Sequence, residues 1–127
     1  MARILVVDDE PAVVDLVKII LEKAGHSVDE AYNGKEALKA LGVDPQDAAA
    51  PLPDLVVLDV MMPIVDGYTV AITMKNDARA GRVPLIVVTA KNDMRHLFEA
   101  IPSVAAFVAK PFDPGALRAT VAKILGA

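Results

Sequence analysis

The chain has 127 residues, of which 54% are hydrophobic, and carries a formal net charge of −4 at pH 7. This length is typical of one domain, so we expect residues 1–127 to form a single domain. The absence of cysteine excludes disulfides, thiol catalysis and zinc–thiolate sites. The acidic balance argues against direct nucleic-acid binding, and no apolar run approaches the roughly 20 residues of a membrane helix. We therefore expect a cytoplasmic protein without a membrane contact.

The first half of the chain alternates short apolar strands with helical patterns. Residues 3–7 are typical of a buried strand, and the strand runs directly into two acids. Pro11 suits the first turn of a helix, in which apolar side chains recur at helical spacing until Gly25. A weaker strand over residues 27–31 and a short amphipathic helix around 37–41 follow.

The second half continues the alternation after a loop over residues 42–53. In chain order we expect a strand over 54–58, a helix from 67 to about 79, a strand over 84–88, a helix over 92–100, a strand over 104–109 and a last helix capped by Asp113. Repeated strand–helix units predict a parallel sheet with right-handed crossovers and helices on both faces.

Chemically active side chains stand where four of the expected strands end. Asp8 and Asp9 follow the first strand, and Asp59 follows the third. Thr89 ends the fourth strand, and Lys110 follows the fifth. Taken singly, each residue has an ordinary reading as a helix cap or a solvated group. Ligands of open α/β sheets bind beyond the carboxyl ends of the strands, so the convergence of all five favours a site.

Clustered carboxylates need a compensating charge. Two carboxylates about 4 Å apart repel by about 4 kcal/mol at an effective dielectric near 20. A small set of oxygen ligands favours Mg²⁺, which also bridges to phosphate. The Lys110 ammonium would add positive charge for a phosphoryl oxygen, and Thr89 could donate a hydrogen bond to another. Since a carboxylate can itself accept a phosphoryl group, the pattern indicates phosphoryl transfer.

These residues resemble the motifs of receiver domains of two-component response regulators, in the stand-alone, chemotaxis-type form. The matching pieces are Asp8-Asp9, Asp59-Val60-Met61-Met62-Pro63 with Asp66-Gly67, Thr89-Ala90 and Lys110-Pro111-Phe112. They occur in order along the whole chain. The resemblance implies a flavodoxin-like three-layer sandwich, with a five-stranded parallel sheet in the order 2-1-3-4-5 and five helices. It also implies one receiver domain over 1–127 with no output domain.

The resemblance assigns roles to the acidic residues and the lysine. Asp59 would be the phosphoacceptor. Asp8, Asp9 and Asp59 would hold Mg²⁺, together with the backbone carbonyl of Met61. Lys110 would pair with Asp59 and then with the phosphoryl group.

The resemblance also assigns a switch. Thr89 would follow the phosphoryl group on activation, and Phe107 stands where the family has an aromatic switch residue on the fifth strand. Ala90 is small, as expected of the residue beside the phosphate. The Lys110–Pro111 peptide bond would be cis. Pro102 departs from the family pattern and is expected to shorten or redirect the preceding helix.

The function implied by the resemblance is a phosphorylation-controlled switch rather than an ordinary enzyme, although the chain would catalyse its own phosphorylation and dephosphorylation. A sensor histidine kinase or phosphotransfer protein would donate the phosphate, and an unidentified downstream protein would receive the signal by docking. The alternative is a Mg²⁺-dependent phosphohydrolase with an aspartate nucleophile. Such enzymes usually carry a second acid two residues after the nucleophile, where this chain has Met61.

Overall fold

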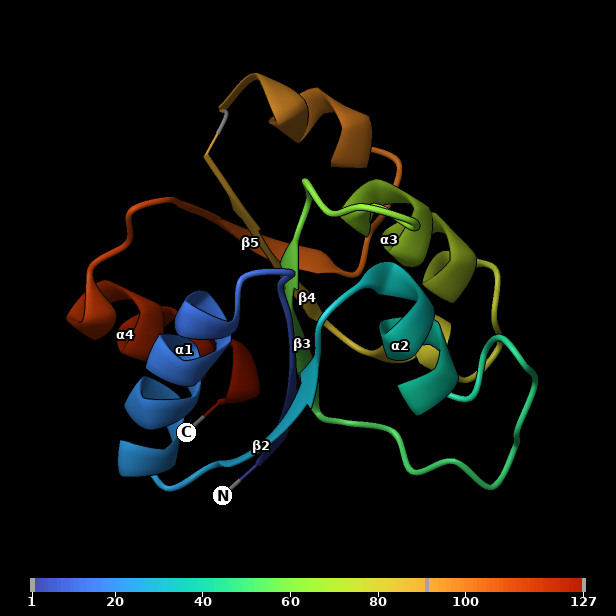
Figure 1. Cartoon of the computed structure of the whole chain (residues 1–127), viewed down its shortest axis with the longest axis horizontal. Helices are drawn as coiled ribbons and strands as arrows, with labels where there is room; N and C mark the ends of the chain where they lie inside the picture. The colour runs from blue at the N-terminus through green and yellow to red at the C-terminus, as the bar shows by residue number, and fades with distance from the viewer. Residues whose placement is uncertain (1, 91, 127) are drawn as a thin grey trace.

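A five-stranded parallel sheet forms the centre of the structure. The computed structural model describes residues 2–90 and 92–126. The strand order is β2-β1-β3-β4-β5, with every neighbouring pair parallel (Figure 1). The strands are β1 (Arg3–Val7), β2 (Ser27–Ala31), β3 (Leu55–Asp59), β4 (Leu85–Thr89) and β5 (Val104–Ala109). The predicted sheet is confirmed, although β3 and β4 each begin and end one residue later than expected.

The burial of each strand explains how clearly the sequence indicated it. The central strands β3 and β4 are buried at every position, because helices cover both faces of the sheet. The edge strand β2 is mostly exposed and carries Asp29 and Glu30. Its sequence therefore lacks the apolar run that marks the central strands.

Within the part of the chain that the structure describes, four α-helices cover the two faces of the sheet. They are α1 (Pro11–Lys23), α2 (Gly34–Ala40), α3 (Gly67–Lys75) and α4 (Pro114–Leu125). Helices α1 and α4 lie on one face, and α2 and α3 lie on the other (Figure 1). Alternate residues of β1 serve the two layers: Ile4 packs in the α1–α4 core and Leu5 in the α2–α3 core. None of the described helices combines the length and hydropathy that a bilayer crossing requires.

The fourth expected helix forms differently, so the prediction of five α-helices is wrong. The segment is a 3₁₀-helix, η2 (Asn92–Phe98), and a second 3₁₀ turn, η1 (Ala80–Arg82), follows α3. Beyond η2 the tight pattern continues, because the Ile101 N–H donates to the Phe98 carbonyl at 3.0 Å. Phe98 and Ile101 are both buried, and a period of three residues brings both to the core side.

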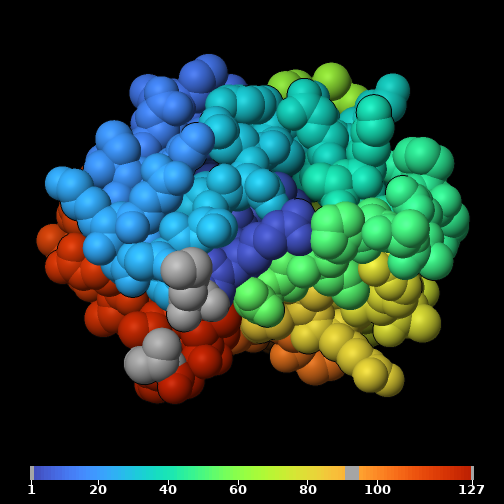
Figure 2. All heavy atoms as spheres, turned by 90° about the horizontal axis from the view of Figure 1, so that it is seen from below, coloured from blue at the N-terminus to red at the C-terminus, as the bar shows by residue number. Residues whose placement is uncertain are grey.

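The long loop over residues 42–53 lies at the amino-terminal edge of the sheet. Figure 2 views the molecule from that side and shows the green loop region next to the dark-blue start of β1. The Arg79 guanidinium donates to the carbonyls of Asp47 and Ala50, at 3.1 and 2.6 Å. The loop is thus tied to the segment after α3, at the end of the sheet opposite the predicted site.

Candidate functional site

The buried polar side chains of the described residues all lie at the carboxyl-terminal edge of the sheet. Asp8 directly follows β1, Asp59 ends β3 and Thr89 ends β4, with exposed fractions of 3%, 4% and 2%. Lys110 directly follows β5. The parallel sheet therefore delivers four of the predicted residues to one edge from four strands.

The Lys110 ammonium joins two of the buried acids. Its Nζ lies 2.8 Å from Asp8 Oδ2 and 3.3 Å from Asp59 Oδ1. The predicted pairing of Lys110 with Asp59 is present as an ion pair, but the contact with Asp8 is shorter. The Lys110–Pro111 peptide bond is cis, as the resemblance implied.

The start of α1 orients Asp8. The backbone N–H of Glu10 donates to Asp8 Oδ1 at 2.9 Å, while Asp8 Oδ2 accepts from Lys110. Glu10 is the N-cap residue of α1, and its side chain makes no capping hydrogen bond. The acids before α1 therefore do not cap the helix through their side chains; Asp8 instead receives a backbone hydrogen bond and faces the site.

Asp59 borders both apolar and charged side chains. A cavity of only about 10 Å³ is lined by Asp59 and Asp8, with Val57, Val88 and Phe112 among its other lining residues. Such a space holds one water molecule at most. Burial, together with the negative charge of Asp8, raises the pKa of Asp59 to about 6, although Lys110 opposes the shift. The carboxylate is thus poorly solvated and under-compensated.

The lysine keeps its charge in this setting. Burial acts to lower the pKa of Lys110, but the hydrogen bond to Asp8 and the charges of Asp59 and Asp8 together raise it above its ordinary value. Lys110 is consequently an ammonium at neutral pH, able to pair with an incoming anionic group.

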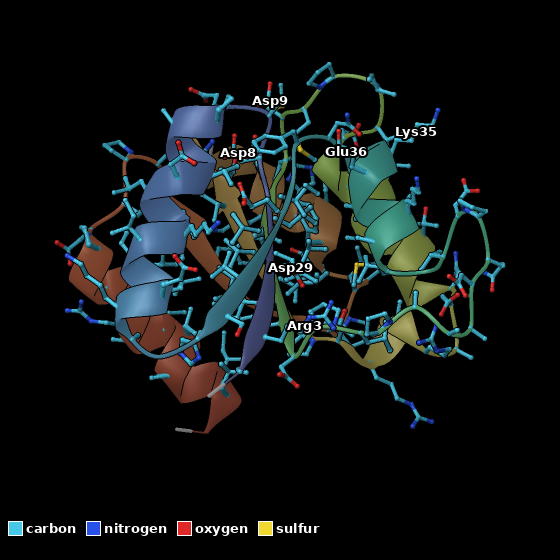
Figure 3. All side chains as sticks on the ribbon, turned by 60° about the horizontal axis from the view of Figure 1, so that its bottom comes forward. Arg3, Asp8, Asp9, Asp29, Lys35 and Glu36 are labelled. Atoms are coloured by element: carbon cyan, nitrogen blue, oxygen red, sulfur yellow. The ribbon has the colours of Figure 1, made fainter. Side chains whose placement is uncertain are left out.

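Asp8, Asp9 and Glu10 bring carboxylate oxygens within 4.8 Å of one another. Asp8 is buried, Asp9 half-buried and Glu10 exposed. Figure 3 shows Asp8 and Asp9 together at the end of β1, far along the strand from Arg3 and its ion-pair partner Asp29. Asp9 also contributes to the raised pKa of Asp59, which places its charge within electrostatic reach of that residue. Closely spaced oxygen ligands with a surplus of negative charge fit a hard divalent cation such as Mg²⁺.

The connection from β3 to α3 is packed tightly against Asp59. The Gly67 N–H donates to the Val60 carbonyl at 2.9 Å, and a Cβ on Gly67 would collide with the backbone carbonyl of Asp59. Ile64 adopts φ 71°, a left-handed conformation unusual for a β-branched residue. The Met61 side chain is 55% exposed. Use of the Met61 backbone carbonyl as a metal ligand remains a prediction.

The predicted switch residues lie at the end of β4 and on the neighbouring strand β5. Thr89 is buried at the end of β4, and the following Ala90 is exposed. Phe107 is half-buried on β5, with its ring centroid 5.9 Å from that of Phe98 in an edge-on arrangement. The Arg95 guanidinium lies 5.2 Å from the Phe107 ring centroid. Their roles in switching remain predictions.

Sequence reasoning missed two residues that the structure brings into these contacts. Glu10 lies with its Oε1 3.9 Å from Lys110 Nζ, a contact that the sequence did not indicate. Its position beside Asp9 was a signal, but adjacency alone does not tell which way a side chain turns. Arg95 packs over Phe107, and nothing in the sequence around it indicated that contact.

Comparison with known proteins agrees with the geometry. The model of the family described as "Response regulator receiver domain" matches residues 4–122. TrrA from Thermotoga maritima, solved in complex with Mg²⁺ and BeF, superposes with a TM-score of 0.80 at 34% sequence identity. That match covers 98% of this chain and 99% of TrrA.

Two curated relatives match this chain over different fractions of their own length. The DNA-binding dual master transcriptional regulator RpaA of Synechocystis is 39% identical over 126 residues, which cover 98% of this chain and 49% of RpaA. Protein PilH of Pseudomonas aeruginosa is 31% identical, and the match covers 98% of both chains. The chain thus spans about half the length of RpaA and nearly all of PilH.

Proposed function

Because this chain belongs to the response regulator receiver domain family, we propose that it accepts a phosphoryl group on Asp59 and thereby changes its affinity for a partner protein. Receiver domains act in two-component phosphoacceptor signalling, so the family supplies the general function. The observation that carries the assignment of Asp59 is its burial, at 4% exposure, beside the Lys110 ammonium that it shares with Asp8.

The proposed reaction is a direct displacement at phosphorus. A carboxylate oxygen of Asp59 forms a bond to phosphorus while the phosphorus–nitrogen bond of a phosphohistidine breaks, and the electron pair leaves with the imidazole. The reaction requires the ionised form of Asp59, which the pKa of about 6 provides at neutral pH. No general base is needed, because the carboxylate is already the nucleophile.

Asp8, Asp9 and Asp59 would hold the Mg²⁺ ion, with the Met61 backbone carbonyl as a further ligand. When bound, the ion supplies positive charge that offsets the repulsion between the carboxylates and the phosphoryl oxygens. Lys110 would stay beside Asp59 and donate a hydrogen bond to a phosphoryl oxygen. Support for this set comes from the close spacing of Asp8 and Asp9 and from the Lys110 ammonium that Asp8 shares with Asp59.

Conformational switching would start from Thr89. Its hydroxyl would move toward the phosphoryl group, next to the small Ala90, and Phe107 would follow on the neighbouring strand. The pairing of Thr89 with Ala109 joins the end of β4 to β5, which supports coupling between the two strands. A change at Phe107 would also reach Phe98 and Arg95, which both contact its ring.

Receiver domains take phosphate from histidine kinases or phosphotransfer proteins, and such a protein is the proposed donor here. The proposed receiver of the signal is a downstream protein that docks on the phosphorylated form in the cytoplasm, without direct nucleic-acid contact. The net charge of −4 supports the last point, since nucleic-acid-binding surfaces are basic. The alternative of a phosphohydrolase is not favoured by the comparisons, which match receiver domains.

Phosphorylation of matched aspartate variants tests the proposal. The parent chain, Asp59→Asn and Asp54→Asn are incubated with Mg²⁺ and acetyl phosphate, and the modified residue is identified by mass spectrometry after borohydride trapping. Asp54 precedes the same strand at its opposite end, so its variant should label like the parent. Asp59→Asn should not label. Equal labelling of Asp59→Asn and the parent would contradict the proposal.

A further inference from the structure

Glu10 is a charged residue at the edge of the site. Neither the family resemblance nor the proposed function gives it a role. Its side chain is 66% exposed, yet its Oε1 lies 3.9 Å from Lys110 Nζ. An exposed glutamate ordinarily samples several side-chain orientations in solvent. Attraction to Lys110 favours those that turn this carboxylate toward the site.

The position of Glu10 on the backbone also holds it at the site. As the N-cap residue of α1, Glu10 donates its backbone N–H to Asp8, at 2.9 Å. A residue tied in this way to a buried acid has little freedom to move its Cα away. The carboxylate oxygens of Asp8, Asp9 and Glu10 accordingly lie within 4.8 Å of one another.

Charge at this edge is strongly unbalanced. Asp8, Asp9, Glu10 and Asp59 contribute four carboxylates, and Lys110 is the ammonium that contacts three of them. A single ammonium leaves these five groups with a negative surplus, which a divalent cation offsets better than a monovalent one. Glu10 is the most exposed of the four acids.

We infer that Glu10 is a positioning residue of the phosphoacceptor site, an outer carboxylate that shares Lys110 with Asp8 and strengthens Mg²⁺ binding through its charge. The inference rests on the proposed function, because it concerns the same cation. Glu10 acts through space and through Lys110 rather than as a ligand bonded to the ion. Its contribution therefore depends on its charge more than on the exact length of its side chain.

The test measures Mg²⁺ binding directly. Isothermal titration calorimetry with MgCl₂ compares the parent chain with Glu10→Gln, Glu10→Asp and Glu22→Gln. Glu22 is an exposed acid near the other end of the same helix, so its variant removes an equal charge far from the site. Thermal unfolding without Mg²⁺ establishes that each variant is folded at the titration temperature.

Of the three variants, only Glu10→Gln is expected to bind Mg²⁺ clearly more weakly than the parent. Removal of one nearby charge, screened at physiological salt, corresponds to about a fourfold rise in Kd for Glu10→Gln. Glu10→Asp should stay within about twofold of the parent, because it keeps the charge. Glu22→Gln should match the parent. The difference between Glu10→Gln and the parent should shrink at high salt, as expected for an exposed carboxylate.

Other results would overturn the inference. If Glu10→Gln binds Mg²⁺ as tightly as Glu22→Gln, the Glu10 charge has no role. If Glu10→Asp binds Mg²⁺ as weakly as Glu10→Gln, the charge of Glu10 does not act through space. Both results leave the proposed function standing when the parent still takes phosphate on Asp59. If Glu10→Gln binds Mg²⁺ more weakly than the parent but the parent never labels at Asp59, the proposed function alone is overturned. If the parent binds no Mg²⁺, both the inference and the proposed function are overturned.

Discussion

Lys110 lies closer to Asp8 than to Asp59: its Nζ is 2.8 Å from the Asp8 carboxylate and 3.3 Å from that of Asp59. Asp8 also accepts a backbone hydrogen bond from Glu10, so both of its oxygens have partners. Asp59 shares the ammonium with Asp8, and both acids line one small, mostly apolar cavity. Burial first, and then the charge of Asp8, raise the pKa of Asp59 to about 6, even though a lysine is in contact with it.

Replacing Lys110 should change metal binding and phosphoryl transfer in opposite directions. In Lys110→Met the positive charge that repels a cation is gone, so Mg²⁺ affinity should rise by about fivefold. Phosphorylation by acetyl phosphate should slow by about 100-fold, because a donor to the developing phosphoryl charge is lost. Calorimetry with MgCl₂ and the rate of phosphoaspartate formation measure the two effects.

Lys18→Met provides the matched control for this variant. Lys18 also forms an ion pair, with Glu30 at 3.0 Å, but it lies on α1 away from the site edge. Both Mg²⁺ affinity and phosphorylation rate should equal those of the parent in this control. A loss of Mg²⁺ affinity in Lys110→Met would contradict the idea that the lysine and the cation compete for the same acids.

Stability in the absence of Mg²⁺ should depend on the protonation of Asp59. Its pKa is raised from 3.8 to about 6, by burial first and then by the charge of Asp8. Between about pH 4 and pH 6 the folded state thus holds more protons than the unfolded state, so the Asp59 contribution to stability falls as pH rises through this window. Asp59→Asn should be more stable than the parent by about 1 to 2 kcal/mol at pH 7.5.

Urea unfolding in the presence of a chelator measures this difference at pH 4.5 and pH 7.5. The gap between Asp59→Asn and the parent should narrow at pH 4.5, where Asp59 is largely protonated in the folded protein. If the difference in the free energy of unfolding is the same at both pH values, ionisation of Asp59 carries no penalty in the folded protein. Asp54→Asn, at the opposite end of β3, should show no such pH-dependent gap.

Gly67→Ala should damage the site through the backbone of Asp59. The new Cβ would collide with the Asp59 carbonyl and lie 2.8 Å from the Val60 Cα. Relief of this overlap requires a backbone shift, and we expect a loss of about 1 to 3 kcal/mol in the free energy of unfolding, with slower phosphorylation. Urea unfolding and the acetyl phosphate assay measure the two losses.

Gly115→Ala is the control for the glycine variant. Gly115 also lies in the first turn of a helix, α4, where a Cβ would meet the Asp113 carboxylate at 3.2 Å and no backbone atom of another element. Alanine favours helices over glycine, so this variant should be as stable as the parent or slightly more stable. Equal behaviour of the two glycine variants would mean that the contact with Asp59 is unimportant.

The contact of Arg95 with Phe107 should be measurable as a coupling energy. Arg95→Ala removes the guanidinium over the ring, and the exposed setting predicts a loss of about 0.5 to 1 kcal/mol in stability. In a Phe107→Leu background the same replacement should have a smaller effect, because the aromatic face is gone. Unfolding of the four chains of this cycle gives the coupling, and a value of zero would exclude the cation–π contact from any role in holding Phe107.

Much of the fold was predictable because buried strands carry their own signal. The run before Asp8 and the run before Asp59 are apolar throughout, and each ends at an acid. The fourth α-helix could not be predicted correctly, because Phe98 and Ile101 are compatible with helical and with 3₁₀ spacing.

The chemical groups of the site could be identified from local patterns, since the alternation of strands and helices places Asp8, Asp59, Thr89 and Lys110 at one sheet edge. How those groups share charge became visible only in the folded protein: Lys110 favours Asp8, Glu10 turns toward the lysine, and Asp59 is left under-compensated. The positions of strands and helices along the chain follow from local patterns. Distances of 3 to 4 Å between charged atoms depend instead on the packing of residues remote in sequence.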